Sequence, residues 1–409
     1  MTKSTKGSLL PIFVTVFLDM LGIGIIIPVI PALFFEADSS FFDPTISRDF
    51  RSITYGLLIG AFPFMQFFGA PILGALSDRF GRKPMIMVSL TGTMIGYLLF
   101  ALAVALQNLP LLFLSRMLPG FFGGNISIVY AAIADVSDEQ SRPKNFGLVG
   151  MSFGLGFILG PSLGGVLADD SVVSWFGPET PFLFTAALTL LNIGLVWRWF
   201  RETIEARRQT PLNPLQGFRN IAKSFSEPRL RTIFSVVLLL SLGFSFFTQF
   251  FSVLLIEKFS YSEKDIGFLF AWIGLWLVIT QGVFVRRLSR IASPKKILRY
   301  SILALGLALL ALLLPDKSYL FFFLNPLVAI AQGITSPNLT TVVSVQAGAE
   351  YQGEVLGINQ SMLSLGQIVP PLIAGYLNTI SGSLPILASG LIVVLGWAVY
   401  VLVFCRKEK

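Results

Sequence analysis

Long runs of apolar residues recur along the whole chain and constrain its fold more than any other feature. A helix needs about 20 mostly apolar residues to cross the hydrocarbon core of a bilayer. About twelve runs satisfy this length, at residues 9–35, 53–76, 84–106, 111–136, 145–168, 181–200, 232–256, 265–285, 297–314, 320–343, 354–377 and 384–404. Barrel strands alternate in polarity over about 10 residues, so these continuous runs do not fit them. The sequence predicts an all-α membrane protein.

Composition excludes several other classes of protein. Only 13% of the 409 residues are charged, whereas soluble domains carry about 25%. The chain has one cysteine, Cys405, so an internal disulfide is impossible. It has no histidine, which removes the usual metal ligand and the usual proton carrier near neutral pH. No nucleophile–base pair or phosphate loop stands out, so we expect neither an enzyme nor a metal site nor a cofactor.

The positions of lysine and arginine predict the orientation in the membrane. With the N-terminus inside, 23 of the 30 basic residues fall in the termini and the loops on the inner side. By the positive-inside rule, both termini are therefore cytoplasmic. The net charge of +8 is then explained by anionic lipid at the inner leaflet. We expect a multi-pass protein of the plasma membrane, in a bacterium the inner membrane, with lipid neighbours and no nucleic-acid partner.

A polar, proline-containing stretch at residues 201–231 divides the chain near its midpoint. We interpret it as a cytoplasmic linker between an N-terminal bundle, residues 1–200, and a C-terminal bundle, residues 232–409. A shift of 210 residues superposes equivalent positions of the two halves, namely Gly156 on Gly366, Pro161 on Pro371 and Gly165 on Gly375. This indicates a duplicated bundle. Secondary transporters are built in this way, with the cargo site near the bilayer midplane.

The loop between the second and third expected spans holds a dense cluster of charges. Four of its six residues from 78 to 83 are charged: Asp78, Arg79, Arg82 and Lys83. Gly74 should allow close helix approach, and Gly81 should permit a tight reversal. We interpret the loop as a latch between the two bundles. Anchoring by the positive-inside rule alone would explain Arg82 and Lys83, but neither Asp78 nor the glycines.

The fifth expected span combines small residues with a proline. Gly156, Gly160 and Gly164 recur every four residues and make one helix face nearly flat, and Gly165 extends it. Pro161 removes a backbone donor and bends a helix. A bend on a smooth face is suited to a rocking surface, although a generic packing seam would explain the glycines equally well.

Asp19 is the only acid deep within an expected span. It lies about ten residues, or ~15 Å, from the inner face, and Arg116 lies about five residues, or ~8 Å, from the outer face. In a core of ~30 Å this leaves roughly 7 Å between them in depth. We expect Asp19 to load and release a coupling proton and Arg116 to modulate it. A static ion pair between the helices is the alternative, and Asp135 is interpreted as a boundary residue.

Amides and aromatic residues in the spans are candidates to contact a cargo. Isolated amides beside aromatic rings favour a greasy, weakly polar molecule, and Phe246, Phe247, Phe250 and Phe251 could line its pocket. The candidates are Gln66, Gln249, Trp272, Trp276, Gln281, Gln332, Asn338, Asn359, Gln360 and Gln367.

The motifs at residues 18–31, 74–84, 114–120 and 156–165 resemble those of the major facilitator superfamily, specifically its drug:proton antiporters similar to bacterial tetracycline efflux proteins. The resemblance implies twelve transmembrane helices in two six-helix bundles related by pseudo-twofold symmetry. It also implies that residues 156–165 mark an exporter. In that family the acid equivalent to Asp78 bridges to the start of the eleventh helix, which here falls near Gly353 and Glu354.

Two departures from the family pattern bear on the expected latch and on the expected cargo. The counterpart of the charged loop in the second half, residues 282–290, contains no acid, so any latch there is not symmetric. The best-known tetracycline exporters use a histidine, which this chain lacks. This argues against tetracycline as the cargo.

The sequence therefore predicts a monomeric, proton-coupled exporter of hydrophobic or amphipathic small molecules that works by alternating access. Two alternatives stay open. One is a major-facilitator carrier of a lipid or a specific metabolite, and the other is a transporter-like receptor or scaffold that moves nothing.

Overall fold

The computed structural model describes residues 9–36, 41–43, 45–136, 142–204, 215, 218–219, 222, 225–226, 228–347 and 352–405. Within these residues every regular element is a helix. The N-terminal half contains α1 (Leu9–Phe35), α2 (Arg48–Phe80), α3 (Arg82–Ala105), α4 (Leu109–Phe122), η1 (Gly123–Asn125), α5 (Ile126–Val136), α6 (Arg142–Ala168) and α7 (Thr180–Trp199). The C-terminal half contains α9 (Pro228–Phe259), α10 (Glu263–Ile279), η2 (Thr280–Phe284), α11 (Val285–Leu288), α12 (Pro294–Ala311), η3 (Ser318–Leu320), α13 (Phe321–Ala347), α14 (Gln352–Ile380), α15 (Leu384–Val399) and η4 (Tyr400–Phe404).

Each expected span falls on one of these helical rods. The α4–η1–α5, α10–η2–α11 and α15–η4 segments each form one nearly continuous rod. The ends of the rods differ from the sequence prediction by at most five residues, the largest difference being the start of α2 at Arg48 rather than residue 53. Among the described residues, nine helices are both long and apolar enough to cross a membrane. The prediction of an all-α membrane protein is confirmed.

Polar caps explain why several rods begin before their apolar run. The Ser47 hydroxyl accepts a hydrogen bond from the Phe50 amide at 3.3 Å, and the Asn108 side chain accepts one from Leu111 at 2.9 Å. Ser262 forms a capping box with Asp265 at the start of α10. A cap satisfies amides that the first helical turn leaves without partners. The helices therefore extend beyond the hydrocarbon-length segment that hydropathy detects.

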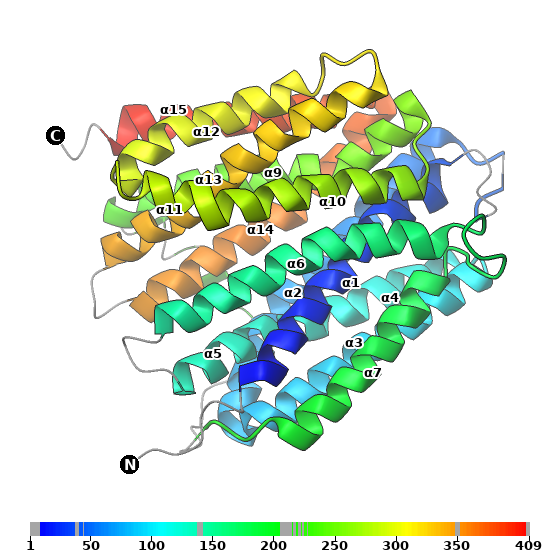
Figure 1. Ribbon diagram of the computed structural model, residues 1–409, viewed down its shortest axis with the longest axis horizontal. Helices are drawn as coiled ribbons and strands as arrows, with labels where there is room; N and C mark the ends of the chain where they lie inside the picture. Colours follow the sequence, from blue (N-terminus) through cyan, green and yellow to red (C-terminus); the bar gives the residue numbers. More distant parts are fainter. Residues whose placement is uncertain are drawn as a thin grey trace.

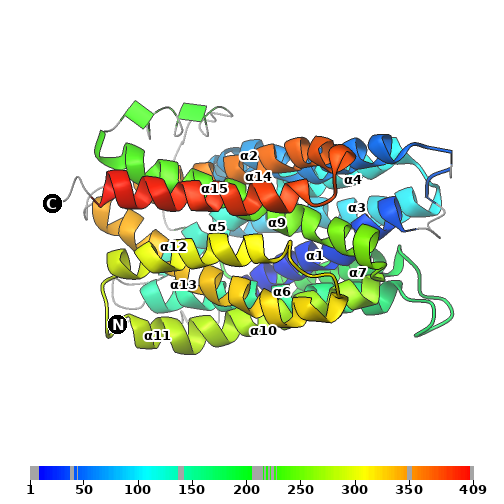
Figure 2. The same ribbon diagram turned by 90° about the horizontal axis from the view of Figure 1, so that it is seen from above.

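The two halves lie side by side and meet mainly along α2, α6, α10 and α14, with α1 also packed against α9. Figure 1 shows α1 to α7 on one side and α12, α13 and α15 on the other, with α6, α10 and α14 along the boundary. The second rod of each half packs against the fifth rod of the other, α2 against α14 and α10 against α6. This reciprocal pairing is what a pseudo-twofold axis between two six-helix bundles produces. Figure 2 shows the rods running nearly parallel.

The repeated glycine and proline positions make equivalent contacts across this boundary. A Cβ atom on Gly267 of α10 would collide with the Pro161 carbonyl oxygen of α6, and one on Gly56 of α2 would collide with the Pro371 carbonyl oxygen of α14. The sequence repeat therefore has a structural counterpart. At both seams the backbones of the two halves are in direct contact.

The flat face of α6 packs mainly within its own half. A Cβ atom on Gly160 would lie 2.7 Å from Gly24 Cα of α1, and one on Gly164 would lie 2.6 Å from the Ile25 carbonyl oxygen. Gly156 likewise packs on Met20 of α1. Gly165 instead approaches Glu263 and Lys264 of α10. The glycine stripe thus fixes α1 against α6 together with the Pro161 ring, while the Pro161 carbonyl group and Gly165 face the other half.

The buried side chains form one cluster in each half and a third that joins them. The joining cluster includes Leu21 and Tyr55 from the N-terminal half and Phe246 and Phe250 from the C-terminal half. Phe247 and Phe251 belong to the cluster of the C-terminal half. All four phenylalanines are at most 3% exposed. Their predicted role as the lining of a cargo pocket is therefore wrong for this conformation, because their rings are enclosed by core side chains.

The contact of α6 with α1 gives a first prediction. Gly160→Leu should lower the thermal unfolding midpoint of the detergent-solubilised protein, because overpacking a close seam costs about 1–3 kcal/mol or more. Gly194→Leu on α7 is the matched control, since nothing lies within 4 Å of a Cβ atom at Gly194. Equal midpoints for the two variants would contradict the direct backbone contact between α1 and α6.

Candidate functional site

Asp19 of α1 lies beside an amide carried by the fourth rod. The Asn125 side chain donates a hydrogen bond to the Asp19 carboxylate with Nδ2 and Oδ2 2.8 Å apart. Asn125 is 1% exposed, whereas Asp19 keeps part of its surface accessible. Gly124, next to Asn125, packs on the backbone of α2 at Ala70, which holds this segment in place. The acid is therefore neither sealed on all sides nor free of partners.

Arg116 is buried without an ion pair. Its side chain is 7% exposed, and no described acid lies within ion-pair distance of its guanidinium group. The guanidinium carbon lies 4.9 Å from the centroid of the Phe62 ring, a cation–π geometry. Its Nε atom has no hydrogen-bond partner among the described residues. The static ion pair between Asp19 and Arg116 is thus wrong.

The expected closeness of these two residues in depth stays a prediction. The α4–η1–α5 rod runs from Leu109 to Val136, and 28 residues rise by ~42 Å, more than the ~30 Å core. Nine residues separate Arg116 from Asn125, or roughly 14 Å of helix rise. Arg116 and the partner of Asp19 therefore lie on the same rod but more than two helical turns apart.

Tyr97 of α3 lies near both charged groups. Its hydroxyl is so close to α1 that a Cβ atom on Gly22 would collide with it. The same phenol lies within electrostatic range of both Asp19 and Arg116. Sequence reasoning missed Tyr97 and Asn125. The sequence does contain a signal for Asn125. This residue lies eleven residues before the end of α5, and Asp19 lies ten residues after the start of α1, so the two residues are expected at a similar depth.

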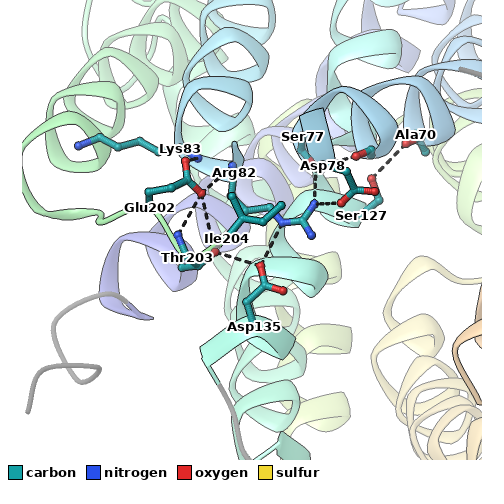
Figure 3. Close-up of polar contacts among 11 residues, drawn as sticks. Ala70, Ser77, Asp78, Arg82, Lys83, Ser127, Asp135, Glu202, Thr203 and Ile204 are labelled. Carbon is teal, nitrogen blue, oxygen red and sulfur yellow. Dashed lines mark hydrogen bonds and ion pairs between the residues drawn. The ribbon is translucent and has the colours of Figure 1, made fainter. Parts of the chain in front are cut away.

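The charged loop is organised around Arg82, as Figure 3 shows. The Arg82 guanidinium donates to Asp78 Oδ1 at 2.6 Å, to the Ser77 hydroxyl at 2.6 Å and to Asp135 Oδ2 at 3.1 Å. Arg82 is only 7% exposed. It therefore joins α2, α3 and α5 in the N-terminal half, and anchoring by positive charge alone does not account for it. Asp135 is its partner at the end of the fourth rod.

Glu202, in the segment after α7, caps the start of α3. Its carboxylate accepts hydrogen bonds from the Arg82 amide at 2.9 Å and the Lys83 amide at 3.2 Å (Figure 3). A carboxylate at a helix N-terminus is stabilised by the free amides and the helix dipole. The Lys83 ammonium donates to the Trp197 carbonyl at 2.8 Å. Sequence reasoning assigned Glu202 to the linker and missed this contact.

The other residues of the charged loop, Gly74, Gly81 and Arg79, differ in their backbone conformation and surroundings. Gly81 has φ +107°, which strains any other residue, and it ends α2 in the tight reversal that was predicted. A Cβ atom on Gly74 would meet only the Ser127 hydroxyl at 3.5 Å, an ordinary contact. Close approach at Gly74 is therefore not required in this conformation. Arg79 is partly exposed at the end of α2.

The expected bridge from Asp78 to the eleventh helix cannot be placed. Gly353 and Glu354 belong to α14, but their side chains lie outside the described residues. The bridge therefore stays a prediction, and the contact described for Asp78 is the one with Arg82.

Among the described residues, the ion pairs between the halves lie at the end of the rods where α2 begins, here called the Arg48 end. Arg48 donates to both carboxylate oxygens of Glu257 at 2.8 Å, and Lys264 lies 3.3 Å from Asp169. Hydrogen bonds from Ser171, together with Lys264, hold the pKa of Asp169 below its usual range. Asp169 therefore stays ionised through the neutral range.

Two hydrogen bonds reinforce the same end. Asn378 of α14 donates to the Ser52 hydroxyl of α2 at 3.0 Å. The Tyr55 hydroxyl of α2 donates to the Gln249 carbonyl of α9 at 2.6 Å. Together with the backbone contact at Gly56, they join α2 to the C-terminal half at this end.

The predicted cargo contacts make separate local contacts, and their joint role as a cargo site stays a prediction. Gln66 donates to the Gly123 carbonyl, Asn338 to the Ile334 carbonyl and Trp272 to the Phe322 carbonyl. Trp276 stacks edge-on against Trp272, and its indole N–H has no described partner. Asn359 is buried and Gln332 partly buried, Gln281 and Gln367 are exposed, and the Gln360 side chain lies outside the described residues. A cavity of about 770 Å³ in the C-terminal half is lined by none of them.

Comparison with known proteins gives a consistent result over the whole chain. The family model described as Major Facilitator Superfamily matches residues 12–371 and 233–409. The chain belongs to this superfamily.

Its relatives within the superfamily cover nearly the whole chain. It is 31% identical to the class B tetracycline resistance protein of Escherichia coli, over 98% of this chain and 94% of that protein. It is 30% identical to multidrug resistance protein 1 of Bacillus subtilis strain 168, over 96% and 97% of the two chains. The structure of a D-xylose-proton symporter superposes with a TM-score of 0.77 at 14% identity, covering 96% of each chain. This major facilitator protein is therefore a membrane transporter rather than an enzyme.

The Arg82 network gives a second prediction, for stability. Arg82→Ala should destabilise the protein by about 2–3 kcal/mol, less than the ~3–5 typical of a fully buried pair, since the two acids are still about a quarter exposed. Arg198→Ala, an exposed arginine at the end of α7, is the control and should unfold like the wild type. The measurement is the thermal unfolding midpoint. Equal unfolding midpoints for the two variants would refute the role of Arg82 in joining α2, α3 and α5.

Proposed function

We propose that this major facilitator protein is a proton-coupled exporter of hydrophobic or amphipathic small molecules, acting as a monomer by alternating access. Its similarity to resistance proteins for tetracycline and for multiple drugs supports a drug as cargo. The absence of histidine favours a cargo other than tetracycline. With the Arg82 end facing the cytoplasm, as the basic residues favour, both termini are cytoplasmic.

The observation that carries the proton coupling is the environment of Asp19. An acid inside the membrane is costly and marks a functional site by default. Asp19 has one neutral donor, Asn125, and no described cation within ion-pair distance. Such a carboxyl group is not locked in its charged form. Access to water from one side or the other can then decide whether it holds a proton.

The contacts at the Arg48 end support alternating access. Two partly exposed ion pairs join the two halves there, beside the buried hydrogen bond between Asn378 and Ser52 and the apolar cluster that joins the halves. Ion pairs of this kind contribute little each, typically 0–1 kcal/mol when exposed. Breaking these ion pairs therefore costs little, and opening the outer end also requires the close contacts at Gly56 and Gly267 to part. We infer that this conformation is closed to the outside.

The role of Asp19 gives a third prediction. In vesicles with an imposed pH gradient, Asp19→Asn should abolish gradient-driven transport of a lipophilic fluorescent cation, because the amide cannot exchange a proton. Binding of the same dye, measured by fluorescence polarisation, should persist. Asp316→Asn, an exposed acid between α12 and α13, is the control and should transport normally. Undiminished gradient-driven transport by Asp19→Asn would remove this residue from the mechanism.

The same assay separates the alternatives. A response to a lipid or a metabolite, but to none of a panel of lipophilic drugs, would favour a specific carrier. Folded protein that responds to no compound would favour a receptor or scaffold.

The outer closure gives a fourth prediction. In a Cys405→Ser background, Ser52→Cys combined with Asn378→Cys should be joined by a short bifunctional thiol reagent, because the native side chains are in contact. The cross-link should stop transport, and cleaving a reducible linker should restore it. Ser52→Cys alone, treated in the same way, is the control. Full activity of the cross-linked protein would argue against opening at this end.

A further inference from the structure

A cavity of about 770 Å³ opens on the C-terminal half, away from the boundary between the halves. It runs between α12 and α13, which lie side by side in Figure 2, and reaches α11 and the loop after it. Along α12 its lining extends from Lys296 to Ala311, or roughly 22 Å at 1.5 Å per residue. The groove is therefore longer than the ~15 Å depth of one leaflet, half of a ~30 Å core.

Apart from one end, the walls of this groove are almost entirely apolar. Small residues of α12, among them Ala304 and Ala308, form its floor, and Leu327 and Ile330 of α13 form one wall. Tyr300 and Leu307 line the groove with 64% and 55% of their surfaces exposed. In a membrane these surfaces face acyl chains and not water. A furrow of this shape fits a linear hydrocarbon chain.

The remaining end of the groove is basic. Lys296 lines it directly, and Arg287, Arg290 and Arg299 belong to the same short stretch. From residue 285 to residue 300 the sequence has no acid. Among the described residues, no acid forms an ion pair with Arg287, Arg290 or Lys296.

A cap and two hydrogen bonds fix the backbone at the start of α12, which carries Lys296 and Arg299. Pro294 and the Ser293 cap begin the helix, and the Tyr400 hydroxyl donates to the Lys295 carbonyl at 3.0 Å. The Trp397 indole donates to the Arg299 carbonyl at 2.8 Å. Tyr300 adds an aromatic ring of the kind that is enriched where headgroups meet acyl chains. The basic end of the groove is thus a prepared surface for an anionic headgroup.

We propose that this groove binds one anionic phospholipid of the leaflet at the α11–α12 loop, with an acyl chain between α12 and α13 and its phosphate at Lys296 and Arg290. Apolar burial cannot select a lipid here, because the surrounding tails are equally apolar. Selection comes from the charge of the headgroup, which basic residues near the membrane surface attract. The site is independent of Asp19 and of the proposed cargo.

Native mass spectrometry of the full chain, released from detergent after exposure to equal amounts of phosphatidylglycerol and phosphatidylcholine with identical acyl chains, tests this proposal. The wild type should retain one phosphatidylglycerol in preference to phosphatidylcholine, by roughly tenfold or more given two nearby cations. Lys296→Gln with Arg290→Gln should remove the preference. Arg219→Gln, an exposed cation in the linker, is the matched control and should keep it.

Blocking the groove gives the second arm. Ala304→Trp fills the furrow from an exposed position and should abolish retention of the lipid. Ala187→Trp, on an exposed face of α7, should not. Retention of phosphatidylglycerol by Ala304→Trp at the wild-type level would overturn the proposal. So would loss of dye binding in Ala304→Trp with unchanged lipid retention, because the groove would then belong to the cargo.

Discussion

Direct backbone contact between helices is the constraint on which the arrangement of this protein depends. In a bilayer the hydrophobic effect does not draw helices together, so packing and polar contacts must do so. Gly56 against Pro371 and Gly267 against Pro161 bring the two halves into contact at two equivalent places. Gly160 against Gly24 does the same for α6 and α1. At these positions the nearest atoms belong to the backbone, whereas farther along the same helices the side chains of Leu372 and Ile158 fill the seams between the halves.

Three charged residues, Arg82, Arg116 and Asp19, have different kinds of partner. These differences distinguish a structural role from a functional one. Arg82 is almost fully paired, with two acids and a hydroxyl, and so stabilises one conformation of its half. Arg116 is buried against the Phe62 ring with no acid nearby among the described residues. Asp19 has one neutral partner and stays partly accessible. Only the last arrangement leaves a group free to change its charge without breaking an ion pair.

The fold could be predicted from the sequence more completely than the site. Span positions follow from hydropathy, and the 210-residue repeat indicated a duplicated bundle, whose Pro161 and Pro371 make equivalent contacts with Gly267 and Gly56. The partners of Asp19 were missed, although the depth of Asn125 along its rod was calculable. Glu202 was hidden because a linker segment turns back to cap α3, which no local pattern indicates. The phenylalanines of α9 were assigned to a pocket because composition cannot distinguish an enclosed ring from one that lines a cavity.

The two halves share a fold but not their electrostatics, and this asymmetry has a physical consequence. In the N-terminal half the loop cation Arg82 is neutralised within the protein by Asp78 and Asp135. The corresponding loop of the C-terminal half has six cations between residues 285 and 300 and no acid of its own. Among the described residues, Arg287, Arg290 and Lys296 form no ion pair with an acid of the protein, and basic residues at a membrane surface attract anionic lipids. The charge of Arg82 is thus balanced within its own half, whereas in the C-terminal half the proposed lipid site would supply the balancing charge.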